Sequence, residues 1–211
     1  LPVYYEPLES PFRNTMVSTQ FDPLTVVLED DENPIVAPAD PDYPLVATTY
    51  RVTEHYLSGM MTRHDGWLNE LQPAMFFEIS PELAALRGLK NLDWAVVSTP
   101  RDEIEAQVLV TERMQPLLVD GKPAYVVGML WSFGYKGEAV GDTANDLSPM
   151  ALAPNADIQG TKSFVCQLRA GRLAKPRPLT PEPVGPLPLD SPVNRASSSR
   201  NLPERTESHV D

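Results

Sequence analysis

Residues 94–111 read Trp94-Ala-Val-Val-Ser-Thr-Pro-Arg-Asp-Glu-Ile-Glu-Ala-Gln-Val-Leu-Val-Thr111. The first part, Trp94 to Thr99, is a short apolar run rich in valine, which is typical of a buried strand. The last part, Glu103 to Thr111, alternates between polar and apolar residues, as a strand with one covered face does. Pro100-Arg-Asp102 lies between them and predicts a turn. We therefore expect the two runs to pair as a β-hairpin.

Four more segments outside this hairpin have the same character, and two segments predict helices. The further strands are expected at Leu45–Thr49, Met75–Ile79, Ala124–Leu130 and Ser163–Leu168. Ser80 to Gly88 is expected to be a helix because it offers a serine N-cap, a proline at the first position and a terminal glycine. A short helix is expected over Asp65–Leu71. Six short strands without regular helical crossovers favour a mainly β (α+β) fold, a closed barrel with helical insertions.

The composition divides the chain into three parts. Residues 1–44 are rich in proline and in Asp and Glu, which predicts an extended arm. Its many apolar residues favour an ordered arm lying on another surface, although a disordered acidic linker is the alternative. Residues 45–170 hold the expected strands and form the expected barrel domain. Residues 171–211 are rich in proline and serine, which predicts a disordered tail.

Charge and cysteine content exclude several classes of protein. The formal net charge of −12 argues against nucleic-acid binding through phosphate contacts. The single cysteine, Cys166, excludes an internal disulfide, a cysteine-held iron–sulfur cluster and a four-cysteine zinc site within these residues. We expect no metal site. We also expect no direct membrane span, because no apolar run reaches the length of a bilayer. The start at Leu1 suggests a fragment or a processed product.

The densest group of polar side chains follows directly after the expected strand Leu45–Thr49. The segment Tyr50–Thr62 contains seven residues that offer hydrogen bonds or conformational freedom: Arg51, Thr53, Glu54, His55, Ser58, Gly59 and Thr62. Ligand sites of barrel proteins are commonly built from loops that leave the end of a buried strand. Because the chain shows no catalytic motif elsewhere, the segment predicts a cofactor-binding domain whose chemistry lies on another part of the enzyme.

Three catalytic or metal-binding alternatives carry less weight. His64-Asp65 has the residue types of a catalytic pair, but no nucleophile motif accompanies it, so Asp65 is expected to start a helix. Met60 and Met61 are expected to pack rather than to bind a metal. Cys166 lies in an expected strand and should point into or against the barrel.

An ordered series of motifs resembles the C-terminal domain of the formate dehydrogenase large (alpha) subunit. The series comprises Tyr50-Arg-Val-Thr-Glu-His55, Gln72-Pro, Phe77-Glu-Ile79, Glu82-Leu-Ala, Ser98-x-x-Arg101, Ala106-x-Val108-x-Val110-Thr-x-Arg113, Val119-Asp-Gly-Lys122, Trp131-x-x-Gly-Tyr-Lys-Gly137, Ala144-Asn-Asp-Leu-Ser-Pro149 and Lys162-Ser-Phe164. Each motif alone is weak, but their common order is specific. The resemblance covers about residues 3–170 and is strongest to the respiratory type of formate dehydrogenase.

The resemblance implies a fold and a cofactor. The family's domain is a six-stranded double-psi β-barrel that helps to bury bis-molybdopterin guanine dinucleotide around molybdenum or tungsten, shared with upstream domains. On this basis Arg51, Thr53, Ser58, Gly59 and Thr62 would bind pterin and phosphate groups. Glu54 and His55 would contact pterin nitrogens. Asn145 and Lys162 would contact the cofactor, and Trp131 would form a wall of the cleft.

The resemblance also implies what these residues leave to others. The family's metal ligand and catalytic residues lie upstream, so we expect no catalytic residue here. The expected partners are the upstream catalytic part of the large subunit and an iron–sulfur electron-transfer subunit. The expected location is the periplasm by resemblance, otherwise the cytoplasm. The alternatives are a nitrate, thiosulfate or polysulfide reductase, or a non-enzymatic barrel that serves as an interaction module.

Two turns depart from the family pattern. The family usually has glycine at the position of Leu92 and at the position of Asp102. The turn before Trp94 must therefore form without glycine. In the hairpin, Asp102 would adopt a left-handed conformation only at a cost.

Overall fold

The structure is a computed structural model that describes residues 8–16, 26–27, 30–135, 138–153, 158–160 and 162–175. The predicted tail beyond residue 175 lies outside the described residues. Within the described residues, no helix is both long enough and apolar enough to cross a bilayer. The description below concerns the compact unit that contains the barrel.

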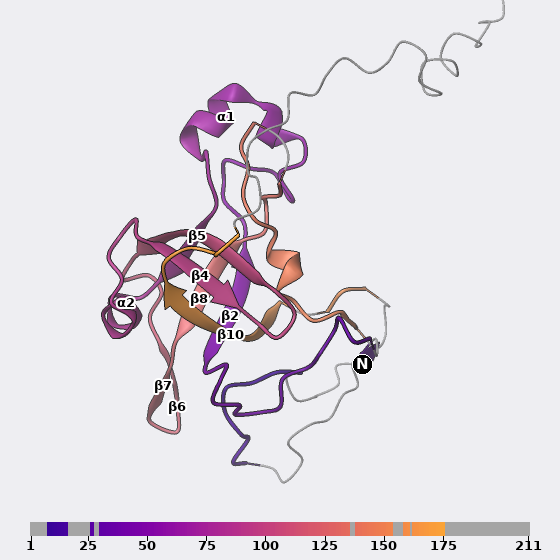
Figure 1. The fold of residues 1–211 in the computed structure, drawn as a ribbon, viewed down its shortest axis with the longest axis vertical. Helices are drawn as coiled ribbons and strands as arrows, with labels where there is room; N and C mark the ends of the chain where they lie inside the picture. The colour runs from indigo at the N-terminus through magenta and orange to yellow at the C-terminus, as the bar shows by residue number, and fades with distance from the viewer. Residues whose placement is uncertain are drawn as a thin grey trace, which may run out of the picture. The chain divides into compact units, whose positions relative to one another are not determined.

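Six strands close into a barrel in the order β10-β2-β8-β3-β5-β4 (Figure 1). Their bounds are β2 Leu45–Tyr50, β3 Phe76–Ile79, β4 Trp94–Ser98, β5 Glu103–Val110, β8 Val126–Leu130 and β10 Ser163–Ala170. Two pairs, β2 with β8 and β3 with β5, are parallel, and the other four are antiparallel. The prediction of a mainly β fold with a closed six-stranded barrel is confirmed.

The expected hairpin is the antiparallel pair β4–β5, in which Ser98 lies opposite Glu103 and Trp94 opposite Gln107. Residues of both strands, such as Val97, Ile104 and Val108, are fully buried in the core. The hairpin turn corrects one expectation. Among the described residues, positive φ outside glycine occurs at Ala39, Leu57, Leu92 and Asp120, so Asp102 is not left-handed. The turn before β4 does form without glycine, because Leu92 itself adopts φ 70°.

Two helices follow their sequence signals closely. Helix α2 spans Pro81–Arg87, with the Ser80 hydroxyl accepting from the Leu83 N–H at 3.1 Å. Gly88 ends it in the left-handed conformation, φ 65°. Helix α1 spans Gly66–Leu71, and the Asp65 carboxylate caps it by accepting from Trp67 N–H. Asp65 therefore starts a helix, as predicted.

Short elements complete the fold. The strand predicted at Ala124–Leu130 is interrupted at Tyr125: β7 (Lys122–Ala124) pairs with β6 (Leu117–Val119) in a separate hairpin, and β8 continues in the barrel. The hairpin turns at Asp120-Gly121, both of which have positive φ. The predicted loop after Gly134 contains the short helix η2 (Ala144–Asp146), and β1 (Val26–Val27) pairs with β9 (Ala151–Leu152).

Residues 56–71, which we call the helical lobe, contain η1 (Thr62–His64) and α1. No residue of η1 or α1 is buried, and in Figure 1 α1 stands apart from the barrel strands. The lobe exposes six large apolar side chains: Tyr56, Leu57, Met60, Met61, Trp67 and Leu71. The expectation that Met60 and Met61 pack is wrong, since each is 70% exposed. Arg63 links the lobe to the loop that follows β8, because its guanidinium donates to Gly134 O and Ala139 O.

A buried ion pair joins the N-terminal arm to the barrel. Arg101 Nη1 and Glu9 Oε1 lie 2.7 Å apart, and their side chains are 3% and 0% exposed. Glu9 also accepts from the N–H groups of Val36 and Val165, and Arg101 donates to Leu147 O and Pro34 O. Such complete pairing is what a buried charge requires. At this point the arm lies on the barrel.

The chain also stays in contact with the barrel just beyond β10. The Arg172 guanidinium lies 3.7 Å from the centroid of the Trp94 ring and donates to Glu105 at 2.6 Å. The Leu173 N–H donates to the same carboxylate at 2.7 Å. Glu105 is buried in the barrel wall. The residues that follow Ala170 therefore cover a buried carboxylate.

Candidate functional site

A cavity of about 470 Å³ opens at the C-terminal end of β2. We call it the strand-end cavity. Its walls come from four parts of the chain: the end of β2, the segment after β8, the short helix η2 and the segment that leads into β10. The lining residues are Thr49, Tyr50, Arg51, Trp131, Asn145, Gln159 and Lys162. A volume of this size is within the usual range for small-molecule sites, roughly 300–1,000 Å³.

The strand-end cavity combines two cations with neutral hydrogen-bonding groups. The Arg51 guanidinium lies 5.2 Å from the centroid of the Trp131 ring, within reach of a cation–π contact. Lys162 adds a second positive charge, and Asn145 and Gln159 add amides that donate and accept. The chain as a whole has a net charge of −12. Local groups decide anion binding, so this cavity is suited to an anionic ligand despite that total.

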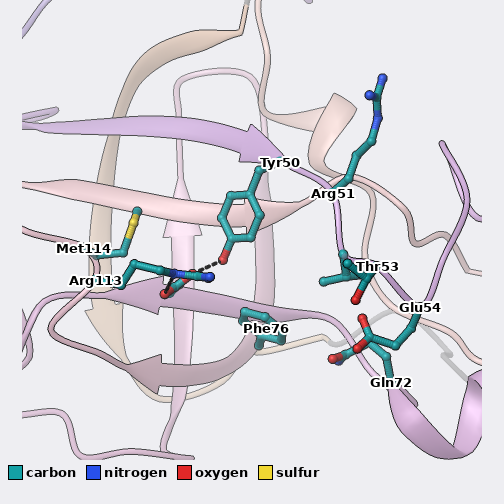
Figure 2. A pocket seen from close by; sticks show the side chains of 10 residues that line it. Tyr50, Arg51, Thr53, Glu54, Gln72, Phe76, Arg113 and Met114 are labelled. Carbon is teal, nitrogen blue, oxygen red and sulfur yellow. Dashed lines mark hydrogen bonds and ion pairs between the residues drawn. The ribbon is translucent and has the colours of Figure 1, made fainter.

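A second cavity, of about 510 Å³, adjoins the first and shares Tyr50 and Arg51 with it. We call it the side cavity. Its other lining residues are Val52, Thr53, Glu54, Gln72, Phe76, Glu78, Arg113 and Met114. Figure 2 shows Thr53, Glu54 and Gln72 close together, with Arg113 and Met114 on the other side of Tyr50. In the same view Arg51 points away from the Tyr50 ring.

Glu78 is a fully buried carboxylate at the floor of the side cavity. It accepts hydrogen bonds from Tyr50 Oη at 2.5 Å, Thr111 Oγ1 at 2.7 Å, and Arg113 Nε and Nη2 at 2.9 and 2.5 Å. Burial alone would raise the pKa of Glu78, but the donors, Arg113 foremost, hold it below the usual value. Burial, together with the neighbouring carboxylate, raises the pKa of Tyr50 above its usual value. Glu78 is therefore ionised and Tyr50 neutral at pH 7.

The predicted site residue His55 is buried inside the loop that follows β2. Its Nε2 lies 2.9 Å from Gln72 O and its Nδ1 3.3 Å from Thr62 Oγ1. Its ring meets Phe133 edge-on, with centroids 5.5 Å apart. Both ring nitrogens thus have partners within the protein, and the imidazole is only 1% exposed. Cofactor contact by His55 stays a prediction; the observed contacts hold the loop together.

The remaining predicted residues of this loop also make internal contacts. Thr62 Oγ1 accepts from the Tyr56 N–H at 3.0 Å. Gly59 has φ 72°, and a Cβ there would lie 2.3 Å from Ser132 O, so the turn requires glycine. Ser58 is half-buried in the same turn. Burial lowers the pKa of the nearby Arg63 guanidinium.

The structure therefore divides the ten predicted site residues into three groups. Arg51, Trp131, Asn145 and Lys162 meet in the strand-end cavity although they are up to 111 positions apart, from 51 to 162. Thr53 and Glu54 line the side cavity, again with Arg51. His55, Ser58, Gly59 and Thr62 belong to the loop interior described above.

Sequence reasoning missed several lining residues. Thr49 and Tyr50 were assigned to a strand and its end, although the last residues of a strand commonly border a ligand site. Glu78 and Arg113 stand within the motifs Phe77-Glu-Ile79 and Ala106–Arg113, and a buried glutamate in an apolar strand was a usable signal. Gln159 lies in a segment with no periodicity and no motif, so nothing in the sequence marked it.

Comparison with known protein families assigns the domain to one of them. Residues 45–163 match the family described as "Molydopterin dinucleotide binding domain". The chain belongs to this family. The match begins at the first residue of β2 and ends at the first residue of β10, so it includes all residues that line the two cavities.

Two curated relatives of this molydopterin dinucleotide binding domain are named formate dehydrogenase alpha subunits. The subunit from Megalodesulfovibrio gigas is 39% identical over 167 residues, which cover 78% of this chain and 16% of the relative. Formate dehydrogenase 2 subunit alpha (cytochrome c-553) from Nitratidesulfovibrio vulgaris is 38% identical over 169 residues, 80% of this chain and 17% of the relative. The chain thus matches about a sixth of the length of these relatives.

A solved structure shares the fold. Acetylene hydratase from Pelobacter acetylenicus matches with a TM-score of 0.52 at 15% sequence identity, covering 80% of this chain and 21% of the hydratase. At this identity the likeness concerns the arrangement of strands and helices alone.

The donor set fits the ligand class that the family description names. A pterin dinucleotide carries phosphates, which suit Arg51 and Lys162, and heterocycles with alternating donors and acceptors, which suit Asn145 and Gln159. The described residues contain no group of three or more His, Cys, Asp or Glu placed to hold a metal ion.

Proposed function

We propose that this domain holds the phosphate-bearing part of a molybdopterin guanine dinucleotide in the strand-end cavity. The observation that carries the proposal is the meeting of Arg51, Asn145 and Lys162 beside Trp131 in one cavity. Arg51 and Lys162 would neutralise phosphate charge, and the Asn145 amide would orient a neighbouring polar group. Trp131 would limit the access of water on one side.

The whole protein would be a molybdenum or tungsten formate dehydrogenase that oxidises formate to carbon dioxide. When bound, the cofactor would supply the two-electron redox chemistry of this reaction. The residues of this chain would bind and orient the cofactor and would supply none of the bond-breaking groups. The relatives named as formate dehydrogenase alpha subunits, at 38–39% identity, support this proposal over the other molybdopterin reductases.

Several finer features belong to the same proposal. The cofactor would be the bis-molybdopterin guanine dinucleotide form, shared with an upstream catalytic part, and the barrel would have double-psi topology. An iron–sulfur subunit would receive the electrons. By its resemblance to the respiratory enzymes, the protein would act in the periplasm, which fractionation of cells that produce it would test.

The helical lobe supports the proposal of a catalytic part beyond this chain. A six-residue helix without a buried face gains little from burial and is marginal by itself in water. The lobe nevertheless exposes Trp67 (85%) and Leu71 (70%), which lie four residues apart on α1, and Met61 (70%), which precedes η1. Gathered exposed apolar side chains of this kind mark interaction surfaces. The upstream part of a polypeptide as long as the relatives would cover the lobe.

Direct binding tests the proposed ligand. The purified chain is mixed with molybdopterin dinucleotide released from a molybdoenzyme, and retained pterin is measured by its fluorescence. We expect Arg51→Ala, Asn145→Ala and Lys162→Ala each to reduce retention several-fold, because each removes a donor from the strand-end cavity. Lys122→Ala is the matched control, since this exposed lysine lies in the β6–β7 hairpin outside both cavities.

The variants must also keep their fold. Arg51, Asn145 and Lys162 are exposed, so we expect the thermal midpoint of each variant to stay within a few degrees of that of the unchanged chain. Equal retention by the unchanged chain and all three variants would contradict the proposed site.

A further inference from the structure

Tyr50 and Glu78 form an inter-strand contact that spans the width of one strand. Glu78 of β3 lies opposite Gly128 of β8, and Gly128 in turn lies beside Thr48 of β2. Tyr50, two residues farther along β2, reaches over β8 and donates its hydroxyl to Glu78 Oε2 at 2.5 Å. The contact thus joins two strands that are not neighbours in the barrel.

Gly128 makes the space for this contact. A Cβ at Gly128 would lie 2.5 Å from Tyr50 Cε1 and 2.8 Å from Met114 Cε. Real Cβ atoms do not approach other heavy atoms so closely, so any larger residue would displace the tyrosine ring. The missing side chain lets the ring lie flat against β8, with Met114 beside it. The ring is therefore held by packing as well as by its hydroxyl.

Glu78 itself has little freedom. Besides Tyr50 it accepts from Thr111 and twice from Arg113, two residues of the segment that follows β5. Removing one donor from such a buried, charged group leaves the others in place. The carboxylate is thus an anchor whose position does not depend on Tyr50 alone.

Tyr50 in turn is the last residue of β2, and Arg51 follows it directly. The Tyr50 carbonyl accepts from the Trp131 N–H at 3.5 Å, and the Arg51 guanidinium lies 5.2 Å from the Trp131 ring. The side chains of the two residues point in different directions: the Tyr50 hydroxyl reaches Glu78, whereas Arg51 points away from the Tyr50 ring (Figure 2). Arg51 thus follows directly on a residue whose side chain is held by a hydrogen bond to Glu78 and by packing at Gly128.

We propose that Tyr50, anchored by Glu78 across Gly128, is a positioning residue that aims Arg51 at the phosphate of the bound ligand. The inference rests on the proposed function, because it takes Arg51 as a phosphate-binding residue. Tyr50 needs no contact with the ligand in this role. Its hydroxyl limits the orientations that the main chain at residue 51 can adopt, and so reduces the entropy that Arg51 loses on binding.

A double-mutant cycle separates positioning from a general effect on the fold. The probe is inorganic pyrophosphate, titrated into the chain by isothermal calorimetry at fixed ionic strength. The variants are Tyr50→Phe, Arg51→Ala and the double variant. We expect Tyr50→Phe to weaken pyrophosphate binding about three- to tenfold. In the Arg51→Ala background the same change should have less than about a twofold effect, because residues that act through one another are not additive.

Two matched controls accompany the cycle. Thr111→Val removes a different donor to Glu78 at 2.7 Å and leaves Tyr50 unchanged, so it should lower stability without weakening pyrophosphate binding. Tyr125→Phe removes a tyrosine hydroxyl outside both cavities and should change neither. If Tyr50→Phe does not fold, Glu78→Gln replaces it in the cycle, since it weakens the same contact from the other side.

The possible failures can be told apart. No measurable pyrophosphate binding by the unchanged chain would overturn the proposed anion site and this inference with it. If Arg51→Ala weakens binding and Tyr50→Phe weakens it by the same factor in both backgrounds, the inference is overturned and the proposed site is left intact. An equal loss in Thr111→Val would also overturn it, because stability alone would then explain the effect.

Discussion

The buried pair of Glu9 and Arg101 is where a single side chain has the largest expected effect on stability. Glu9→Gln keeps the shape of the side chain but leaves the Arg101 charge buried without a counter-charge. Breaking a buried pair in this way costs about 3–5 kcal/mol. We therefore expect the free energy of unfolding, measured with urea, to fall by about that amount.

The chain offers a matched control for this experiment. Arg169 and Glu103 form an ion pair at 3.3 Å whose side chains are 44% and 47% exposed. Because exposed pairs contribute about 0–1 kcal/mol, Glu103→Gln should change the free energy of unfolding little. Equal losses from Glu9→Gln and Glu103→Gln would show that the arm does not depend on the buried pair.

The structural role of a single residue was predictable only where its hydrogen-bonding partners are close to it in the sequence. Ser80 and Asp65 cap the helices that follow them, and the N–H groups that they accept from lie only three and two residues further along the chain. The sequence was therefore enough to assign both caps. Cofactor contact by His55 was inferred from the resemblance and stays a prediction, whereas the contacts that the structure gives it, with Gln72 O, Thr62 and Phe133, were not predicted. Contacts of that kind depend on how the loop folds back, which no local pattern records.

The exposed apolar side chains of the helical lobe give a prediction about an element. We expect the double variant Trp67→Ser, Leu71→Ser to unfold within about 0.5–1 kcal/mol of the unchanged chain, since both side chains are already largely exposed. We also expect it to bind less of the dye anilinonaphthalene sulfonate and to associate less with itself at high concentration, as seen by light scattering. Leu117→Ser, at an exposed leucine of β6, is the control.

A large loss of stability in the double variant would contradict this view of the lobe. It would mean that Trp67 and Leu71 pack within the chain in solution. In that case the lobe would not be the surface that faces a catalytic part.

The strands were more predictable than the segments between them. Five of the six barrel strands were expected from short apolar runs, β5 from its alternation, and the β4–β5 hairpin from the turn between its strands. The two-residue strands β1 and β9 were missed because a pattern needs more residues to show a period. The break at Tyr125 was missed because the apolar run continues through it, while the pairing changes from β6 to β2.

For the whole molecule, the buried carboxylates predict how stability depends on pH. The pKa values of Glu78 and Glu105 are held below the usual value, Glu105 chiefly by hydrogen bonds from Arg172 against the opposing effect of burial. Their stabilising contribution is therefore present above the unfolded-state pKa of about 4.3 and is lost as the pH falls through the lower folded-state values. The pKa of Tyr50 is raised, so its contribution is present below about pH 10 and is lost at higher pH.

Urea unfolding between pH 3 and pH 10.5 at constant ionic strength measures this profile; we expect a plateau from about pH 5 to 9. Glu105→Gln should reduce the loss of stability on the acid side, and Tyr50→Phe the loss on the alkaline side. A profile of unchanged shape in Glu105→Gln would contradict the assignment of the acid limb to this carboxylate.

The closed barrel of the whole molecule was predicted from the periodicity of the sequence. That residues far apart in the sequence line one cavity could not be predicted in this way. Asn145 and Lys162 came from the resemblance, because only the known order of motifs related them to Arg51. The strand order β10-β2-β8-β3-β5-β4 brings their segments to one end of the barrel. Strand order reflects long-range pairing, and a single sequence does not encode it in any local pattern.

The place of β10 between β2 and β4 determines how this domain can be cut for study. The family match stops at residue 163, where β10 begins, and starts after Glu9. A recombinant piece trimmed to the matched residues would lack nearly all of β10, so the barrel would open and two sheet edges would be unpaired. It would also lack Glu9, so the Arg101 charge would be buried without its counter-charge. Such a piece is expected to be insoluble. A piece that runs from residue 8 to residue 175 keeps the closed barrel, the Glu9–Arg101 ion pair and the Arg172–Glu105 contact.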